Sequence, residues 1–309
     1  MSPATVTGEA EGEIRAMARD APTFAQKLAD LAGYLVDEGL GTGVFLALRL
    51  GMPMLLEGEP GVGKTQAAKA IATVLETPLI RLQCHEGIDA AEALYEWNYP
   101  RQLLSIRLAD SAHAKDVKHD VFGHDYLIRR PLLRALEHPG PRPAVLLIDE
   151  IDRADPDFEA FLLELLAEAT VTIPELGTIR ATHPPIIILT SNRTRDLHDA
   201  IKRRCLYQWI DYPSPAREAD ILHRRVGHAP AKLAGQIAIA MGRLRRLDIQ
   251  KPPGVAEAID WIGALTLLGY KELTVEAIDV TLGSVLKYTE DQTELRNEGL
   301  DSLLVAPTA

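Results

Sequence analysis

One eight-residue segment restricts the fold of this 309-residue chain more than any other feature of the sequence. The segment GEPGVGKT spans residues 58–65 and directly follows the short apolar stretch at residues 54–56, which predicts a strand. A helix is predicted after it, over residues 65–75. A glycine-rich turn between a strand and a helix, closed by Gly-Lys-Thr, matches the P-loop pattern. The segment therefore predicts an α/β fold whose sheet carries a phosphate-binding loop.

The residue types of this loop suit a nucleoside triphosphate. Glycines let the backbone wrap closely, so consecutive N–H groups can point at phosphate oxygens. The positive end of the following helix adds to that attraction. We expect Lys64 to reach the β- and γ-phosphates and the hydroxyl of Thr65 to bind Mg²⁺. The predicted ATP-binding residues are Gly58, Glu59, Pro60, Gly61, Val62, Gly63, Lys64, Thr65, Gln66 and Asp149.

A second predicted strand ends in two acids, Asp149 and Glu150, after the apolar run at residues 145–148. Ligands of open α/β sheets bind at the carboxyl ends of strands, so both acids are expected near the phosphates. Asp149 is predicted to bind Mg²⁺ together with Thr65, and Glu150 to act as general base on the attacking water. Two acids after a strand also occur as a solvated turn, but the P-loop favours the catalytic interpretation.

Two further segments supply candidate catalytic residues. Asn192 follows another apolar strand and is predicted to orient the attacking water, although Asn also favours ordinary turns. Arg203 and Arg204 precede the last predicted strand, and either could be an arginine finger aimed at the ATP of a neighbouring subunit. The alternative for this basic run is a solvated helix end. The predicted catalytic residues are Glu150, Asn192, Arg204, Arg203 and Lys64.

The pattern of elements divides the chain into two parts. Five short apolar strands are predicted at residues 54–56, 79–82, 144–148, 186–189 and 206–210. Beyond residue 213 only helical patterns occur, at residues 214–226, 229–247, 255–268 and 275–288. The predicted organisation is a flexible tail over residues 1–20, an α/β domain over residues 21–212 and an all-helical domain over residues 213–309.

Three other segments carry predictions of local structure. A single amphipathic helix is predicted over residues 24–40, and a small hairpin over residues 171–179. Residues 86–126 are interpreted as a hairpin-like insertion followed by a mobile loop near residues 110–125. The insertion contains Tyr95, Trp97 and Tyr99. Gripping of a substrate or partner and packing of the hairpin between subunits are equally good interpretations of these aromatic residues.

Composition narrows the class of protein and its expected location. The net charge of −11 argues against duplex nucleic acid as the main partner, because such binding relies on neutralising phosphates. Cys84 and Cys205 are far apart and form no metal-binding motif, which fits a reducing cytoplasm. The N-terminus does not resemble a secretory signal, and no apolar run is long enough to span a membrane. The spacing of His113, His119 and His124 fits no helix face and no cysteine joins them, so they are interpreted as part of a solvated loop and not as a metal site.

The order of these features resembles the AAA+ ATPases, and within them the MoxR family. The segment LLIDEIDRAD is similar to the Walker B segment of that family, and residues 95–107 and 171–180 look like its two inserts. Segments such as RLQCHEGIDAAEALYEWNYPRQLL, VTIPELGTIRA, LTSNRTRDL, RRCLYQWIDYPSP and KPPGVAEAIDW resemble the CoxD-like subgroup, which is encoded beside proteins with von Willebrand factor A domains. The resemblance covers roughly residues 40–270.

This resemblance implies a five-stranded parallel P-loop core with a small helical lid. It also implies ATP hydrolysis in a ring, expected to be a hexamer, with a von Willebrand factor A protein as partner. The implied role is chaperone-like remodelling of, or cofactor insertion into, a client metalloenzyme, and CoxD itself is implicated in maturing the metal cluster of carbon monoxide dehydrogenase. Arg204 lies nearest the family's finger position, with Arg203 second. The sequence departs from the pattern at Lys251, where many AAA+ proteins have a sensor 2 arginine, and a lysine does not reproduce a guanidinium.

Two other classes of protein share a P-loop. A nucleic-acid-associated ATPase, such as a clamp loader or a helicase, is disfavoured by the acidic charge and by the lack of an added DNA-binding module. A small-molecule kinase should carry several phosphate-gripping arginines in its lid. The helical region instead has arginines without an obvious phosphate-binding arrangement, at Arg224, Arg225, Arg243, Arg245 and Arg246.

Overall fold

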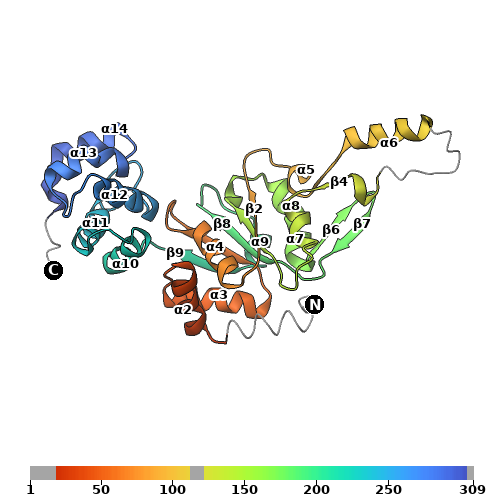
Figure 1. The fold of residues 1–309 in the computed structure, drawn as a ribbon, viewed down its shortest axis with the longest axis horizontal. Helices are drawn as coiled ribbons and strands as arrows, with labels where there is room; N and C mark the ends of the chain where they lie inside the picture. The colour runs from red at the N-terminus through yellow and green to blue at the C-terminus, as the bar shows by residue number, and fades with distance from the viewer. Residues whose placement is uncertain (1–18, 112–121, 305–309) are drawn as a thin grey trace.

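The computed structural model describes residues 19–111 and 122–304. A five-stranded sheet with helices around it forms the larger part of the structure, and a group of helices follows it at the C-terminal end (Figure 1). Most of the predicted N-terminal tail and the middle of the predicted mobile loop, including His113 and His119, lie outside the described residues.

The sheet is entirely parallel, with strand order β2-β5-β8-β1-β9. Its strands are β1 (Met54–Gly58), β2 (Leu79–Gln83), β5 (Val145–Asp149), β8 (Ile186–Ser191) and β9 (Leu206–Ile210). All five strands coincide with those predicted from the sequence. Because β8 lies between β1 and β5, its carboxyl end is adjacent both to the P-loop and to the acids that end β5.

Helices cover both faces of the sheet, and this explains the continuous apolar strands. Along β5, Val145 and Leu147 pack into one buried cluster, while Leu146 and Ile148 pack into the other. Successive side chains of a strand point to opposite faces, so a strand covered on both sides needs apolar residues throughout. The covering helices are α2 (Ala21–Ala32), α3 (Glu38–Leu50), α4 (Lys64–Val74), α7 (Pro131–Leu136), α8 (Pro156–Glu168) and α9 (Asp199–Lys202).

The single helix predicted over residues 24–40 is wrong, because this segment is divided between α2 and α3. Gly33 ends α2 in the left-handed conformation, with a φ of 61°, which glycine adopts without strain. Asp37 then begins α3 by accepting a hydrogen bond from the backbone N–H of Leu40 at 2.6 Å. Gly41 lies inside α3, so it does not end a helix as the sequence suggested.

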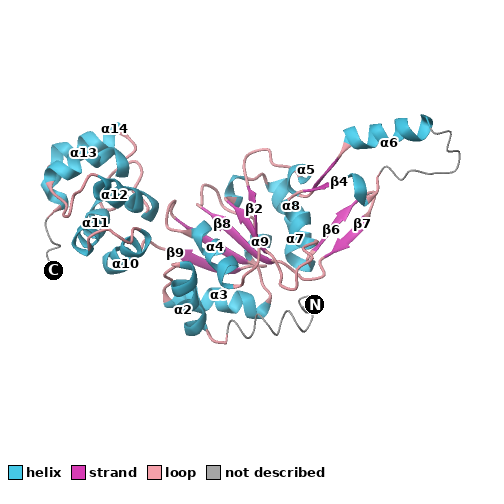
Figure 2. Cartoon of the chain, viewed as in Figure 1, coloured by secondary structure: helices cyan, strands magenta, loops and turns pink. Residues whose placement is uncertain are grey.

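Two small antiparallel ladders lie outside the main sheet (Figure 2). The ladder of β6 (Thr170–Ile173) and β7 (Gly177–Arg180) confirms the second predicted hairpin. The other ladder pairs β3 (Tyr95–Trp97) with β4 (Leu127–Arg129), so the first insertion is a ladder whose strands are far apart in sequence. The intervening chain contains a helix that the sequence analysis missed, α6 (Tyr99–Ser111), and the insertion also includes α5 (Ala90–Ala93) and η1 (His124–Tyr126).

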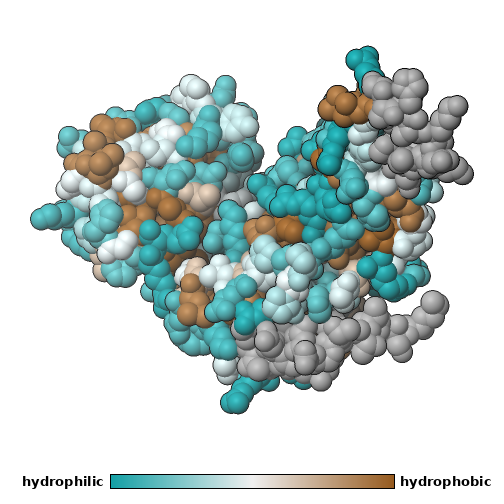
Figure 3. All heavy atoms as spheres, turned by 45° about the vertical axis from the view of Figure 1, so that its right-hand side comes forward, coloured by the Kyte–Doolittle hydropathy of each residue, from teal (hydrophilic) through white to brown (hydrophobic). Residues whose placement is uncertain are grey.

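Helix α6 was missed because its apolar side chains do not gather into one stripe, which is the usual sign of a helix packed against a core. Several of them are exposed: Tyr99, Leu103, Leu104, Ile106 and Leu108. The helix projects from the body of the molecule, and hydrophobic side chains appear on the protruding part at the upper right of Figure 3.

The C-terminal helices pack around a core of their own, centred on the fully buried Trp261. They are α10 (Pro215–Arg225), α11 (Ala231–Leu244), α12 (Val255–Leu267), α13 (Val275–Val285) and α14 (Thr289–Glu298), followed by η3 (Leu300–Leu303). The first four match the predicted helices, and Ser214 caps α10 by accepting from the N–H of Arg217 at 3.4 Å. Helix α14 was not predicted because its sequence, TEDQTELRNE, is almost entirely polar.

Candidate nucleotide-binding site

The predicted phosphate-binding loop joins β1 to α4, as its sequence requires. Gly61 and Gly63 have φ angles of 78° and 100°, which residues with a side chain rarely adopt. Lys64 is the first residue of α4, and its Nζ donates hydrogen bonds to the carbonyl oxygens of Gly58 at 2.7 Å and Glu59 at 2.8 Å. The lysine is therefore held inside the curve of the loop, beside the N-terminus of the helix.

Lys64 is buried, with only 7% of its surface exposed. Burial lowers the pKa of Lys64 to about 8, and this effect exceeds the opposing influence of nearby carboxylates, first among them Asp152. The ammonium is thus in an environment where an added anionic ligand would strongly favour its charged form.

Asp149 is the centre of a polar cluster at the end of β5, where only 2% of its surface is exposed. The hydroxyl of Thr65 donates to its two carboxylate oxygens at 3.1 and 3.2 Å, and the hydroxyl of Thr190 donates to Oδ1 at 2.5 Å. Arg81 Nε donates to Oδ2 at 2.8 Å. Hydroxyl and carboxylate oxygens are ligands that Mg²⁺ prefers, so the convergence of Thr65 and Asp149 fits this ion.

Glu150 adopts a left-handed backbone conformation, with a φ of 56°. Its backbone N–H donates to the hydroxyl of Thr190 at 2.9 Å, which ties the turn after β5 to the neighbouring strand β8. The carboxylate accepts from Gln83 Nε2 at 3.1 Å and pairs with Arg153 at 3.3 Å. Its side chain is one-third exposed, so water can reach it, as the predicted role of general base requires.

The position of Asn192 depends on an acid that the sequence analysis did not single out. The buried carboxylate of Asp152 accepts from the backbone N–H of Asn192 at 3.2 Å, and from the N–H and hydroxyl of Thr194 at 2.9 and 2.7 Å. Asp152 follows the predicted Asp-Glu pair by two residues, but in the sequence it looks like an ordinary solvated acid. Only the fold brings it under the loop that follows β8.

A cavity of about 270 Å³ brings together most of the predicted site. Its lining includes Pro60, Gly61, Gly63, Lys64, Thr65, Gln66, Asp149, Glu150 and Asn192. Three lining residues were not predicted: Lys69, Thr190 and Ala256. The cavity therefore combines an ammonium group, the start of a helix, a pair of acids and an amide at the carboxyl edge of the sheet.

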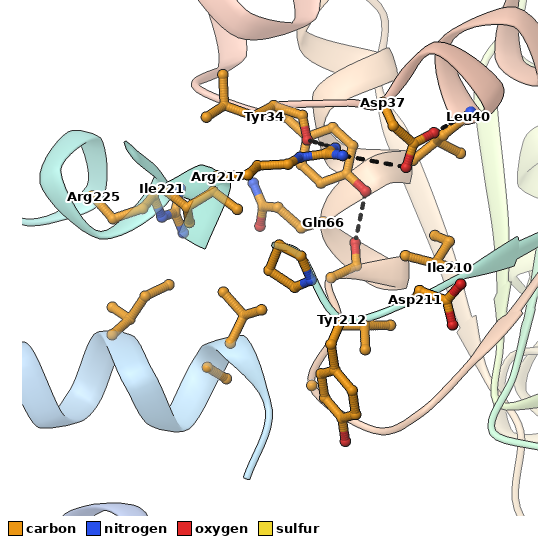
Figure 4. Close-up of a pocket in the computed structure, with 18 of the residues that line it drawn as sticks. Tyr34, Asp37, Leu40, Gln66, Ile210, Asp211, Tyr212, Arg217, Ile221 and Arg225 are labelled. Atoms are coloured by element: carbon orange, nitrogen blue, oxygen red, sulfur yellow. Dashed lines mark hydrogen bonds and ion pairs between the residues drawn. The ribbon is translucent and has the colours of Figure 1, made fainter. Parts of the chain in front are cut away.

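A second cavity, of about 340 Å³, adjoins the first and shares Gly61, Gly63, Gln66 and Ala256 with it (Figure 4). Much of its wall is apolar, and it is formed by Leu40, Val62, Ile210, Ile221, Val255 and Ile259. An apolar pocket with a few polar groups suits a flat ring such as a nucleobase. The two cavities together have the arrangement that a nucleoside triphosphate needs.

Arg217 links the helical region to the turn between α2 and α3 at this second cavity (Figure 4). Its guanidinium pairs with Asp37 at 3.2 Å and donates to the carbonyl oxygen of Leu35 at 2.8 Å. Tyr34 donates to the carbonyl oxygen of Gly63 at 3.4 Å, and burial raises the pKa of its hydroxyl above the usual value. None of these three contacts belongs to a local motif, so they could not be predicted from the residues around them.

Helix α12 of the helical region touches the P-loop directly. The backbone N–H of Val255 donates to the carbonyl oxygen of Gly61 at 3.0 Å. Lys251, considered above as a replacement for a sensor arginine, is exposed and lines neither cavity. Arg245, another arginine of the helical region, is buried and forms an ion pair with Glu218 at 2.6 Å. Its guanidinium also stacks over the ring of Tyr212.

Arg203 and Arg204 lie apart from both cavities of their own chain. Both are exposed at the end of α9, and Arg204 donates to the carbonyl oxygen of Ala200 at 3.0 Å. The structure therefore does not bring them together with Lys64 and Glu150 within one chain.

The remaining candidates from the sequence do not form a site. Burial raises the pKa of the thiols of Cys84 and Cys205 to about 12, so neither is a reactive thiolate. His124 is part of η1, and across residues 19–111 and 122–304 no group of three or more histidine, cysteine or acidic side chains is arranged to hold a metal. Over the same ranges, no helix has both the length and the apolar character needed to cross a bilayer.

Three known proteins resemble this chain, two of them by sequence and one by structure. The chain is 27% identical over 249 residues to the denitrification regulatory protein NirQ of Pseudomonas aeruginosa, covering 78% of this chain and 85% of that protein. It is 26% identical over 206 residues to protein NorQ of Paracoccus denitrificans, covering 64% and 67%. Among solved structures, a mutant of Thermotoga maritima RuvB is similar at 16% identity and a TM-score of 0.45, covering 90% of this chain and 70% of that one.

The model of one protein family matches the part of the chain that holds the sheet and the phosphate site. Residues 53–205 match the AAA domain of the dynein-related subfamily, a span from just before β1 to just before β9. The match contains the P-loop, the two acids at the end of β5 and the asparagine after β8. Residues 53–205 are therefore similar to an AAA domain of the dynein-related subfamily, and the chain has an AAA+ P-loop core with a parallel five-stranded sheet, followed by a helical C-terminal region.

Proposed function

We propose that the chain binds Mg·ATP and hydrolyses it to ADP and phosphate. The observation that carries the proposal is the convergence of Lys64, Thr65, Asp149, Glu150 and Asn192 at the carboxyl edge of one sheet, beside a cavity that suits a base. The P-loop amides and Lys64 would bind the phosphates, and Thr65 and Asp149 would hold the cation. The bound Mg²⁺ would supply charge stabilisation at the phosphates.

The chain's own groups account for the activation of water. The carboxylate of Glu150 is close to Asp149 and accessible to solvent, so it can accept the proton of an attacking water molecule. Asn192 follows the adjacent strand β8 and lines the same cavity, so its amide can orient that water. Asp152 fixes the backbone at Asn192 and keeps the amide in place.

We also propose that the chain assembles into a ring of the MoxR type. Arg203 and Arg204 are exposed and remote from the cavities of their own chain, as a finger that serves a neighbouring subunit must be. A closed ring, expected to be a hexamer, would place one of them at the next ATP site. In this proposal turnover requires assembly, and Arg204 is the first choice for the finger.

The proposed role is chaperone-like remodelling of, or cofactor insertion into, a client metalloenzyme in the cytoplasm, together with a von Willebrand factor A protein. One relative is named as a regulatory protein of denitrification, which favours action on another protein system over conversion of a small substrate. The sequence likeness to the CoxD-like subgroup supports the metalloenzyme, carbon monoxide dehydrogenase being the first candidate.

Phosphate release by purified protein tests the proposal. Wild type should release phosphate from Mg·ATP, whereas Glu150→Gln and Arg204→Ala should bind ATP and release almost none. Mixing these two inactive variants should restore part of the activity, because an intact Arg204 from one subunit can serve an intact Glu150 in the next. Arg246→Ala, which removes an exposed arginine of the helical region, is the control and should hydrolyse ATP normally.

No hydrolysis by folded wild type, or transfer of the phosphoryl group to a small acceptor, would overturn the proposal. Normal turnover in Arg204→Ala would move the finger to Arg203. Strong stimulation of hydrolysis by DNA would support a nucleic-acid-associated ATPase instead.

A further inference from the structure

Arg81 makes a direct charged contact with the predicted magnesium ligand. Its Nη2 lies 2.5 Å and its Nε 2.8 Å from Oδ2 of Asp149, so both nitrogens face the same carboxylate oxygen. The contact crosses from β2 to β5, neighbouring strands in which Gln83 is paired in register with Asp149. Arg81 therefore approaches Asp149 from the edge strand of the sheet.

The hydrogen bonds of Asp149 show which of its contacts a cation must replace. Thr190 bonds to Oδ1, Arg81 bonds to Oδ2, and Thr65 approaches both oxygens. Thr65 is itself a predicted ligand of the same ion. Thr190 is a short, buried side chain that also anchors the backbone of Glu150. Arg81 is the one partner with a positive charge, and a guanidinium cannot share an oxygen closely with a divalent cation.

The exposure of the two partners is very unequal. The side chain of Asp149 is 2% exposed, while that of Arg81 is 49% exposed. The acid cannot turn towards solvent without leaving its buried position, but the guanidinium has solvent on one side. The amide oxygen of Gln83 also accepts a hydrogen bond from Arg81, so the arginine keeps a partner when it leaves the carboxylate. The hydroxyls of Thr65 and Thr190 that bond to Asp149 carry no charge. Arg81 therefore balances its negative charge, and a buried charge left unbalanced is destabilising.

We propose that Arg81 is a displaceable stand-in for the divalent cation: its guanidinium neutralises Asp149 in the nucleotide-free protein and withdraws when Mg·nucleotide binds. This inference rests on the proposed function, since it assumes that Asp149 binds the magnesium of Mg·ATP. Its consequence is that magnesium binding includes the loss of the Arg81–Asp149 pair. The concentration of magnesium needed for ATP binding is then higher than the oxygen ligands alone would require.

The test is the magnesium dependence of binding of a fluorescent ATP analogue to wild type and to Arg81→Gln. Arg81→Gln should reach half-saturation at roughly three- to tenfold less magnesium, the range expected for loss of a half-exposed ion pair. Direct titration of nucleotide-free protein with Mn²⁺, followed by electron paramagnetic resonance, should show tighter binding of the ion in the same variant.

Arg153→Gln is the matched control. Arg153 is similarly exposed, at 53%, and pairs with Glu150 instead of Asp149, so this variant removes the same charge near the site without freeing Asp149. A shift equal to that of Arg81→Gln would show a general effect of charge and overturn the inference. Arg81→Lys keeps the positive charge but loses the second nitrogen donor of the guanidinium. Its half-saturation should therefore need a magnesium concentration between those of wild type and Arg81→Gln. It replaces Arg81→Gln in this comparison if the latter does not fold.

An unchanged or higher magnesium requirement in Arg81→Gln would also overturn the inference, while binding of ATP by wild type in the same experiment would leave the proposed function intact. Wild-type protein that binds no ATP at any magnesium concentration would instead overturn the proposed function.

Discussion

The backbone N–H of Val255 donates a hydrogen bond to the carbonyl oxygen of Gly61 at 3.0 Å, and so joins the helical region to the middle of the phosphate-binding loop. The adjacent Gly254 makes this approach possible. A Cβ on Gly254 would lie 2.7 Å from the Cα of Gly61 and 2.8 Å from the carbonyl oxygen of Pro60, both of them backbone atoms. The geometry of the nucleotide site thus depends on a glycine far from the P-loop in sequence.

Gly254→Ala should push α12 away from the P-loop and weaken ATP binding. Loss of one backbone hydrogen bond and its surrounding contacts corresponds to roughly a five- to tenfold higher Kd. Titration with a fluorescent ATP analogue measures this. Gly263→Ala is the control, because Gly263 lies in α12, the helix that Gly254 precedes, and a Cβ there meets nothing within 4 Å. Equal Kd values for the two variants would show that contact between α12 and the P-loop does not matter for binding.

ATP affinity should fall as the pH rises through about 8, the pKa to which burial lowers Lys64. The phosphates attract the ammonium form, so above this pH binding must first restore a proton. Arg stays charged throughout this range, so Lys64→Arg should show a flatter pH dependence of Kd, whatever its absolute affinity. If Kd changed with pH in the same way in wild type and in Lys64→Arg, the pH dependence could not be assigned to Lys64.

The same shift predicts a pH dependence of stability in the nucleotide-free protein. The folded-state pKa of Lys64 lies below its ordinary value of 10.5, so the unfolded chain binds more protons between pH 8 and 10.5. The contribution of Lys64 to the free energy of unfolding must therefore increase with pH across that window. Denaturant unfolding of wild type and Lys64→Met at several pH values would show it, and a difference that decreases with pH would be the opposite of the prediction.

Asp152→Asn should lower kcat far more than it changes KM, because Asp152 holds the backbone of Asn192 and does not touch the predicted phosphate position. A misplaced water-orienting group is expected to reduce kcat by roughly tenfold or more. Steady-state kinetics separate the two constants. Thr194→Val, which removes only the hydroxyl donor to Asp152, should have a smaller effect. A change confined to KM would argue against this positioning role.

Removing one partner of the buried Arg245–Glu218 pair should lower the free energy of unfolding by about 3–5 kcal/mol. The side chains of Glu218 and Arg245 are 0% and 7% exposed, so either charge left alone would be buried without a partner. Denaturant unfolding of Glu218→Ala, Arg245→Ala and the double variant provides the measurement. The double variant should be less destabilised than the sum of the single ones, and simple additivity would show that the two charges do not stabilise each other.

The sequence predicted those features whose physical cause is local. The P-loop is one continuous segment, and a fully buried strand such as residues 145–148 shows as an apolar run because both of its faces are covered. The prediction of one helix over residues 24–40 was wrong because it followed the apolar periodicity of the whole segment. The structure instead ends one helix at the left-handed Gly33 and begins the next at the N-cap Asp37. Helices α6 and α14 were missed because the first is apolar around much of its surface and the second is polar throughout.

The parts of the site that could not be predicted depend on long-range packing. Tyr34, Arg217 and Val255 come from separate segments that meet only when the helical region lies beside the P-loop. Arg81 reaches Asp149 only because β2 and β5 are neighbours in the sheet, although β2 precedes β5 by more than 60 residues. Nothing in the residues around Arg81 or Asp152 indicates such a partner before the strand order is known.

Calorimetric titration of Mg·ATP into wild type and Lys64→Ala tests the central claim most directly. The structure predicts saturable binding of one nucleotide per chain by wild type and at least tenfold weaker binding by Lys64→Ala, since a charge-assisted contact with phosphate is worth more than 1.4 kcal/mol. Lys232→Ala, which removes an exposed lysine of α11, should bind as wild type does. No binding by folded wild type, or equal affinity in Lys64→Ala, would contradict the account.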